Sequence, residues 1–446
     1  MRIGRAVRTP LCDARPVTAP RPGRAARYGF TALGFPAFRT FFTAQLMTNS
    51  AQFVQGAGIG WISWEVTGTA AGVAAIGFLN VIPYTLLTLH AGLFTDRLGA
   101  RRMVVASLLL SAVALVVLGF LGLVGGIPFL VLGVASAVLG TIAVIGSPGS
   151  FTLVNEIIPP AAVPSAVSLI FLDVNLGRIL GGAVAGVTLA LLPGGWTLIL
   201  AGLLMIPPAL AIRRLRTPPP AEIPVLRGAL VAPLREAAGF AFRDRSLALL
   251  FLMTAVMGSL GQGYNYQLPL AAVELGAGAD GLGVLTGVVG VGGLITGLLL
   301  ERMMRGLGHG RILWLGMWLA SGGMIVCGLA GTLAVAAVGM AIAGAGFAVY
   351  AAGTLSLLQA LAAPELRGRL TALFSLLYWG LMPLGALIGG VMASAIGGLH
   401  TLLVFGVAIL LVSLAGLIAG GDVRRMRVDG EGRPTRAGRR GVLPAP

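Results

Sequence analysis

Long apolar runs separated by short charged segments make up most of this chain. Each run covers about 20 residues, the length that a helix needs to cross the ~30 Å hydrocarbon core of a bilayer. The sequence lacks the alternation of apolar and polar residues that is typical of membrane-spanning strands. We therefore predict an all-α polytopic membrane protein with twelve transmembrane helices. The predicted spans are 40–65, 71–94, 103–124, 128–154, 164–191, 196–213, 247–271, 279–300, 311–330, 332–361, 370–395 and 400–420.

The basic residues are distributed unevenly between the two sides of this arrangement. All 31 are arginines, and 30 of them lie in the two tails and in alternate connections between spans. The connections on the other side carry only Glu274, Asp280 and His400 as ionisable residues. Cytoplasmic loops carry the excess of basic residues in membrane proteins. The pattern predicts a protein integral to the bacterial inner membrane with both termini in the cytoplasm.

Composition narrows the class of function. Only 10% of the residues are charged and 57% are hydrophobic, whereas soluble domains average about 25% charged residues. The net charge of +16 is explained by the cytoplasmic arginines, so we expect no nucleic-acid partner. Cys12 and Cys327 stand far apart, which argues against a disulfide. The sequence shows no nucleophile–base set, phosphate-binding loop or metal cluster, so we expect neither an enzyme nor a cofactor.

Two segments recur with nearly the same spacing. "GLFTDRLGARR" at Gly92 matches "GLLLERMMRGLGHGR" at Gly297, which places Glu301 where Asp96 stands in the first copy. The stretch that starts at Pro160 matches the stretch that starts at Pro364, at an offset of 204 residues. Two matches at this offset predict two pseudo-symmetric six-helix halves with a substrate cavity between them. The predicted divisions are a disordered cytoplasmic tail (1–39), the first half (40–213), a cytoplasmic linker (214–246), the second half (247–420) and a basic tail (421–446).

The loop between the second and third spans resembles the signature of the major facilitator superfamily. The matching residues are Gly92, Leu93, Asp96, Arg97, Gly99, Arg101 and Arg102. The stretches "LVNEIIPPAAVPSAVSLIFLDVNLGRILGGAVAG" and "LRGRLTALFSLLYWGLMPLGALIGG" are similar to the drug- and siderophore-exporting branch that includes enterobactin exporters. The resemblance covers roughly residues 36–420. It implies efflux of a small organic molecule by alternating access.

The chain departs from that branch at positions that antiporters use. Gln52 stands near the place of an acid in the first span, the fourth span has no arginine, and Gly181-Gly182 replaces a Gly-Pro pair. If protons are the coupling ion, Asp173 and Glu156 are the acids left in or near the membrane region of the first half.

Polar residues follow one face of the first span. Gln45, Asn49, Gln52 and Gln55 are separated by four, three and three residues, so they form a stripe on a helix. Hydrogen bonding between helices would explain such a stripe. We favour the wall of a substrate cavity.

Arg178 is the one arginine that lies away from the ends of a predicted span. A charged side chain at that depth is costly unless it is paired or faces water. A structural pair with another helix is one explanation. We favour an anchor for an anionic or carbonyl-rich substrate, with Asn175 on the same helix face.

Further candidates for the cavity lie in the second half. The seventh span contains "GQGYNYQLP", in which glycine and proline would allow the helix to break. Its aromatic residues are also consistent with the interfacial belt of a membrane protein. The candidates are Gln262, Tyr264, Asn265, Tyr350, Tyr378 and Trp379.

Asp96 requires an explanation of its own, because an acid does not contribute to the excess of basic residues that keeps a loop in the cytoplasm. We expect it to meet the start of the eleventh span, where helix N-terminal amides and Arg367 or Arg369 lie. By pseudo-symmetry, Glu301 would meet the start of the fifth span near 163–165. Both contacts would form only when the cytoplasmic side is closed.

These features favour a secondary transporter, an antiporter that exports a drug-like or siderophore-like molecule. An importer, a lipid flippase and a non-transporting membrane sensor on the same scaffold remain alternatives. The expected partners are membrane lipid, a small-molecule substrate and protons as the coupling ion, and we expect a monomer.

Overall fold

The structure is a computed structural model that describes residues 31–159, 162–217, 239, 245–361, 364–419, 426–428 and 434–436. A helix occupies every predicted span, so the assignment of the apolar runs is confirmed. The first bundle contains α1 (Pro36–Thr67), α2 (Ala70–Leu98), α3 (Ala100–Val124), α4 (Phe129–Ile157), α5 (Val163–Leu191), α6 (Gly194–Leu204) and α7 (Ile206–Arg213), preceded by the short turn η2 (Thr31–Gly34). The second bundle contains α9 (Arg245–Val256), η4 (Met257–Gly261), η5 (Tyr264–Tyr266), α10 (Leu268–Glu274), α11 (Gly278–Leu307), α12 (His309–Gly328), α13 (Leu333–Leu361), α14 (Pro364–Tyr378), α15 (Met382–Ile396) and α16 (Gly398–Ala419).

The number of membrane-crossing helices is nearly that predicted. Among the described residues, eleven helical segments are long and apolar enough to cross a membrane. The remaining one, α1, has 32 residues and a length of ~48 Å, but it is not among the eleven. The prediction of an all-α polytopic membrane protein is confirmed, and the count of twelve stays a prediction.

Three of the spans are interrupted helices. The seventh breaks around Gly261 and Gly263, passing through the π-helical turn η4 and the 3₁₀ turn η5 before α10. This break was expected from its glycine and proline residues. The breaks at Met205 and at 379–381 were not predicted, although a proline follows each within three residues. Because proline lacks an N–H group and crowds the preceding turn, it favours such breaks.

The two bundles meet along two pairs of helices, α5 with α11 and α2 with α15. Glycines allow the backbones of α5 and α11 to approach closely. A Cβ atom added at Gly283 would lie 2.5 Å from Cα of Gly186 and 2.7 Å from the carbonyl oxygen of Gly182. Such small-residue contacts are the usual means by which membrane helices associate. We call this contact of Gly182, Gly186 and Gly283 the glycine seam.

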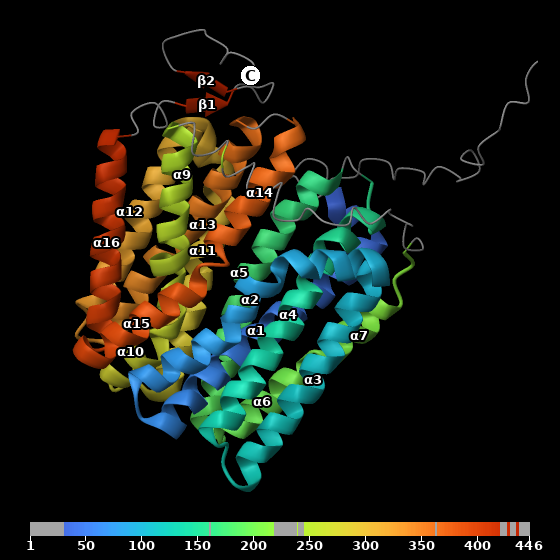
Figure 1. Cartoon of the computed structure of the whole chain (residues 1–446), viewed down its shortest axis with the longest axis vertical. Coiled ribbons are helices and arrows are strands. Elements are labelled where there is room, and N and C mark those ends of the chain that lie inside the picture. Colours follow the sequence, from blue (N-terminus) through green and yellow to red (C-terminus); the bar gives the residue numbers. More distant parts are fainter. Residues whose placement is uncertain are drawn as a thin grey trace, which may run out of the picture.

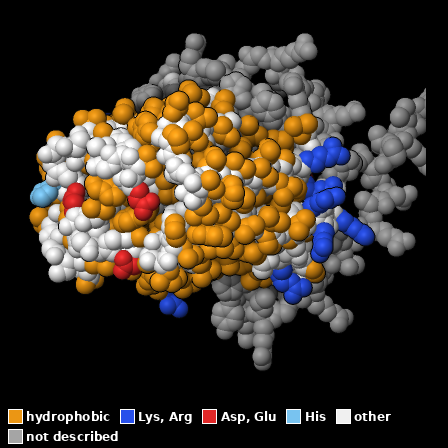
Figure 2. Space-filling view, turned by 90° about the horizontal axis from the view of Figure 1, so that it is seen from below, with side chains coloured by type: hydrophobic (Ala, Val, Ile, Leu, Met, Phe, Trp, Pro, Cys, Tyr) orange, Lys and Arg blue, Asp and Glu red, His pale blue; other side chains and the backbone are white. Residues whose placement is uncertain are grey.

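The charged side chains define two ends of the molecule. The Arg-rich end carries arginines of the loops and helix termini, among them Arg101, Arg102, Arg213, Arg214, Arg302 and Arg311. The acidic end carries Glu65, Glu274 and Asp280. In Figure 2 the acidic side chains lie at the left and most of the arginines at the right, with a wide hydrophobic surface between these two groups. That hydrophobic surface is the part of the protein that suits a bilayer.

The bundles are joined from the acidic end to about the middle of the helices. Contacts between α5 and α11 continue from the glycine seam to Asn175 and Gly293. One turn further, no atom lies within 4 Å of a Cβ built on Gly297, and Phe171 is 42% exposed. In Figure 1 the bundles lean apart toward the end that carries β1 and β2. The described contacts therefore close the acidic end and leave the bundles separated toward the Arg-rich end.

The two halves make the same turn at corresponding places. Gly99 joins α2 to α3 with φ 87° and ψ 136°, and Gly308 joins α11 to α12 with φ 82° and ψ 156°. These positive φ angles favour glycine, which has no Cβ. In the first turn of α3, Arg101 Nη1 donates to the carbonyl oxygen of Leu215 at 2.6 Å, while Arg102 is exposed. The side chains of Asp96, Arg97, Glu301, Arg367 and Arg369 lie outside what the structure describes, so the expected contacts at the Arg-rich end stay predictions.

The tails and the linker are described only in part. Helix α1 begins at Pro36, within the predicted N-terminal tail. Most of the linker 214–246 lies outside the described residues. In the C-terminal tail, β1 (Met426–Val428) pairs antiparallel with β2 (Pro434–Arg436), two strands that the sequence analysis did not predict. β1 contacts α12 at the Arg-rich end.

Candidate substrate site

Arg178 connects the two bundles inside the membrane region. It lies 15 residues into α5, ~22 Å along the helix. Its Nη1 donates a hydrogen bond to the phenol oxygen of Tyr264 in η5, and its guanidinium lies 4.7 Å from the ring centroid of Phe53 on α1. Its Nε is buried and has no hydrogen-bond partner in the described structure. The arginine thus has a partner in each bundle, and its buried Nε donor is left without one among the described residues.

The described contacts of the Arg178 guanidinium are all with neutral groups. Within the described part of the chain it forms no salt bridge, and its contacts are a phenol and an aromatic ring. A cation–π contact and one hydrogen bond recover only part of the cost of placing a guanidinium in a membrane interior. An anionic or carbonyl oxygen would be a stronger partner than the phenol. The site is therefore suited to receive such an oxygen.

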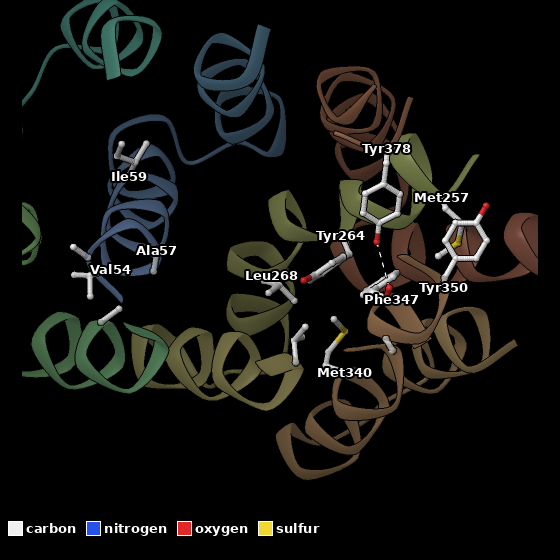
Figure 3. Packing of buried hydrophobic residues seen from close by; sticks show 14 of the residues in the cluster. Val54, Ala57, Ile59, Met257, Tyr264, Leu268, Met340, Phe347, Tyr350 and Tyr378 are labelled. Atoms are coloured by element: carbon white, nitrogen blue, oxygen red, sulfur yellow. Dashed lines mark hydrogen bonds between the residues drawn. The ribbon is translucent and has the colours of Figure 1, made fainter. Parts of the chain in front are cut away.

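Aromatic rings surround the Tyr264 side of this contact (Figure 3). Tyr264 is fully buried and stacks on Phe347 of α13, with centroids 4.8 Å apart. Tyr378 stacks on Phe374 at 5.3 Å, on Tyr350 at 6.3 Å, and meets Trp379 edge-on at 5.0 Å. We call these six residues the aromatic cluster. It provides flat apolar surfaces next to the arginine.

Hydrogen bonds hold the phenols of the aromatic cluster in place. Gln262 Nε2 donates to Tyr378 Oη at 2.8 Å, and Tyr378 Oη donates to the Phe347 carbonyl at 3.5 Å (Figure 3). Tyr350 Oη and Thr254 Oγ1 share a hydrogen bond of 3.0 Å. Because buried phenols prefer a partner, these bonds fix the rings. The structure thus brings the candidates Gln262, Tyr264, Tyr350, Tyr378 and Trp379 into one region.

A second polar contact joins α1 to α5. Asn49 Nδ2 donates to Asp173 Oδ2 at 3.2 Å. Asp173 is fully buried, and its Oδ1 has no partner among the described residues. An unpaired carboxylate oxygen in a buried site is costly when charged. This pair therefore contains an acid for which holding a proton is favourable.

The other candidates lie less close together. Gln52 is exposed, and Gln45 and Gln55 are half-buried. Among the described contacts of the predicted stripe, Asn49 alone hydrogen-bonds to α5. Asn175 donates within its own helix to the Phe171 carbonyl at 2.9 Å, and Asn265 donates to the Gln262 carbonyl at 3.0 Å. Glu156 lies in the last turn of α4 at the Arg-rich end. No group of three or more His, Cys, Asp or Glu among the described residues could hold a metal ion.

Three contacts were missed by the sequence analysis. Phe53 lies under Arg178, but an apolar residue in an apolar span carries no signal of that role. Thr85 Oγ1 donates to the Gly380 carbonyl at 2.5 Å, which joins α2 to the break before α15. Glu274 accepts from the backbone N–H groups of Gly398 and, at 2.9 Å, Leu399. An acid predicted to lie on the same side of the membrane as a helix that begins after Gly-Gly could have suggested this cap.

Comparisons with known proteins agree with this architecture. A family model described as transmembrane secretion effector matches residues 28–427. The multidrug efflux pump Tap of Mycolicibacterium fortuitum is 26% identical over 366 residues, which are 79% of this chain and 88% of that protein.

Solved structures of transporters have the same fold. The nucleoside transporter NupG superposes with a TM-score of 0.67 at 14% identity, covering 86% of this chain and 99% of that one. A POT family transporter in complex with 5-aminolevulinic acid gives 0.72 at 11% identity, with 87% and 97% covered. A bacterial homologue of the lysosomal transporter Spinster, inward-facing and unoccupied, gives 0.66 at 16% identity, with 86% and 97% covered.

Proposed function

Because the chain belongs to the transmembrane secretion effector family of the major facilitator superfamily, and is a membrane transporter rather than an enzyme, we propose that it exports a small organic molecule by alternating access. The similarity to a multidrug efflux pump supports export. We place the Arg-rich end in the cytoplasm, both termini on that side, and α1 as the twelfth span. In this proposal residues 40–213 and 247–420 are the two halves that move against each other, and the chain works as a monomer in the inner membrane.

The hydrogen bond between Arg178 and Tyr264 is the observation that carries this proposal. It joins the bundles near the middle of the membrane, close to where the described contacts between α5 and α11 end. A substrate that enters from the Arg-rich side reaches the arginine through the part where the bundles are separated. Its carboxylate or carbonyl oxygen would replace the phenol, and its apolar part would lie against the aromatic cluster. The preferred substrates are thus organic anions or zwitterions with an aromatic or apolar body.

Proton coupling is assigned to Asp173. The acid is buried beside Asn49 on α1, and one of its carboxylate oxygens has no described partner. In this proposal it holds a proton in the arrangement described here and releases it when the helices around it separate. In the opposite arrangement, closed at the cytoplasmic side, Asp96 meets the start of α14 and Glu301 meets the start of α5. The contacts at the acidic end and those at the cytoplasmic end would therefore form in different states of the transport cycle.

The test is flux in proteoliposomes and drug accumulation in cells that express the protein. A panel of fluorescent organic anions, zwitterions and cations serves as the probe. Arg178→Met removes the charge but keeps most of the length, and we expect flux of the anions and zwitterions to fall by about tenfold or more, since hydrogen bonds to charged groups contribute ~1.5–3 kcal/mol. Arg213→Met, at an exposed arginine in the last turn of α7, should leave flux unchanged.

Tyr264→Phe tests whether the phenol of Tyr264 competes with the substrate for Arg178. If the substrate replaces Tyr264 on Arg178, loss of the hydroxyl lowers the apparent KM by about fivefold, the equivalent of a ~1 kcal/mol hydrogen bond. An unchanged KM in Tyr264→Phe together with full flux in Arg178→Met would refute the assignment. Increased accumulation in expressing cells would make the protein an importer.

A further inference from the structure

A groove on the outside of the second bundle lies apart from the candidate substrate site. It has a volume of about 400 Å³ and is lined by Leu307 of α11, Arg311, Trp314, Leu315 and Trp318 of α12, and Leu417 of α16. This volume lies within the range of ~300–1,000 Å³ in which proteins bind small ligands. We call it the α12 groove. It lies at the Arg-rich end, where α11 ends and α12 begins.

The α12 groove is charged at one end and apolar along the rest. Arg311 is exposed in the first turn of α12, and Trp318 lies seven residues further along the same helix, ~10 Å deeper in the membrane region. Between them, Trp314 and Leu315 form the wall. A ligand that fills the groove would therefore place a negative charge at the Arg-rich end and an apolar chain toward the interior.

The two tryptophans that line the groove are held differently. Trp314 is only 2% exposed, and its buried indole Nε1 has no partner among the described residues. Trp318 is partly exposed and donates from Nε1 to Ser413 Oγ of α16 at 3.1 Å. The groove therefore has a fixed, partly exposed indole at its apolar end and a guanidinium at its charged end.

The surroundings of the groove face lipid. Leu307 is 39% exposed, Trp318 is 41% exposed, and Ile418, next to Leu417, is 88% exposed. Apolar side chains with such exposure belong against hydrocarbon in a membrane protein. Tryptophan is enriched at the level of the lipid headgroups, and basic pockets between membrane helices bind anionic headgroups.

We propose that the α12 groove binds one anionic phospholipid of the leaflet at the Arg-rich end. Arg311 pairs with the phosphodiester, and one acyl chain lies along Trp318 and Leu417. The first backbone amides of α12 add a partial positive charge beside Arg311. A lipid in this place bridges α12 and α16.

Native mass spectrometry measures the headgroup preference directly. The purified full chain is titrated with phosphatidylglycerol and with phosphatidylcholine of identical acyl chains. We expect phosphatidylglycerol to bind about fivefold more tightly, from ~1 kcal/mol for one basic residue at an anionic headgroup. Arg311→Gln should abolish this preference, whereas Arg302→Gln, at an exposed arginine that does not line the groove, should keep it.

Fluorescence quenching in nanodiscs locates the lipid. Phosphatidylglycerol with brominated acyl chains should quench tryptophan more than brominated phosphatidylcholine does, and Trp318→Phe should remove most of that difference. Equal binding of the two lipids, or a preference that survives Arg311→Gln, would overturn the proposal. Displacement of the lipid by inorganic phosphate alone would also overturn it, because the groove would then be a site for a soluble anion.

Discussion

The glycine seam allows a sharp test of how the bundles move. In Gly283→Val, the new Cβ would lie 2.5 Å from Cα of Gly186 and 2.7 Å from the carbonyl oxygen of Gly182. Carbon atoms pack at ~3.5–4.0 Å, so α5 and α11 must separate by ~1 Å or more at this point. The atoms in the way are backbone, and no side-chain rotation relieves the contact.

The cost of this substitution follows from overpacking. Insertion of methyl groups into a close contact costs ~1–3 kcal/mol, which corresponds to a shift of about 5- to 150-fold in a two-state equilibrium. Because the seam lies at the acidic end, the shift favours the arrangement that is open there. Gly306→Val adds the same side chain to the same helix, at an exposed position away from α5 where no atom lies within 4 Å of the Cβ. It should leave the equilibrium unchanged.

Distances between spin labels report the shift. Cysteines are placed at Thr69, in the turn after α1, and at His400 in α16, both of which are exposed at the acidic end, in a background with Ala at Cys12 and Cys327. Double electron–electron resonance should show a longer-distance population in Gly283→Val, and not in Gly306→Val. A distance distribution in Gly283→Val that matches the unsubstituted chain would refute the reasoning, as would an equal shift in Gly306→Val.

Two further substitutions test single contacts. Glu274→Ala removes the acceptor for the first amides of α16 and should lower the free energy of unfolding by ~1 kcal/mol, measured by denaturant titration in detergent; Glu274→Gln, which keeps one amide oxygen, should lose less. Asp173→Asn removes the group proposed to carry the proton. Flux should become independent of a pH gradient, while exchange of substrate across the membrane continues. A gradient dependence that persists in Asp173→Asn, or that is lost instead in Glu156→Gln, would exclude Asp173 as the coupling residue.

The positions of the membrane helices could be predicted from the sequence because they depend on local properties. Length, apolarity and the placement of arginines determine where a helix enters and leaves a bilayer, and each predicted span contains a helix. The prolines near Met205 and before α15 were visible in the sequence, but a proline is compatible with a kink as well as with a break. The residues of β1 and β2 show no apolar pattern from which a hairpin could have been predicted.

The partners of the candidate residues depend on tertiary structure and were harder to predict from the sequence. Arg178 stood out because a charge in an apolar span is rare, yet its partner Tyr264 is 86 residues away. Phe53 is one of many apolar residues in α1. Asn49 and Asp173 were both noticed, on different grounds, and only the packing of α1 against α5 brings them together.

The polar character of α1 has a consequence for how the protein is made. This helix leaves the ribosome before the other described membrane helices, yet it is not apolar enough to be counted among the eleven. Its buried Asn49 is satisfied by Asp173, which is synthesised 124 residues later. Polar residues are unfavourable in lipid without a partner. We therefore expect α1 to settle in the bilayer only after α5 has arrived, so that the order of synthesis differs from the order in which the helices become stably inserted.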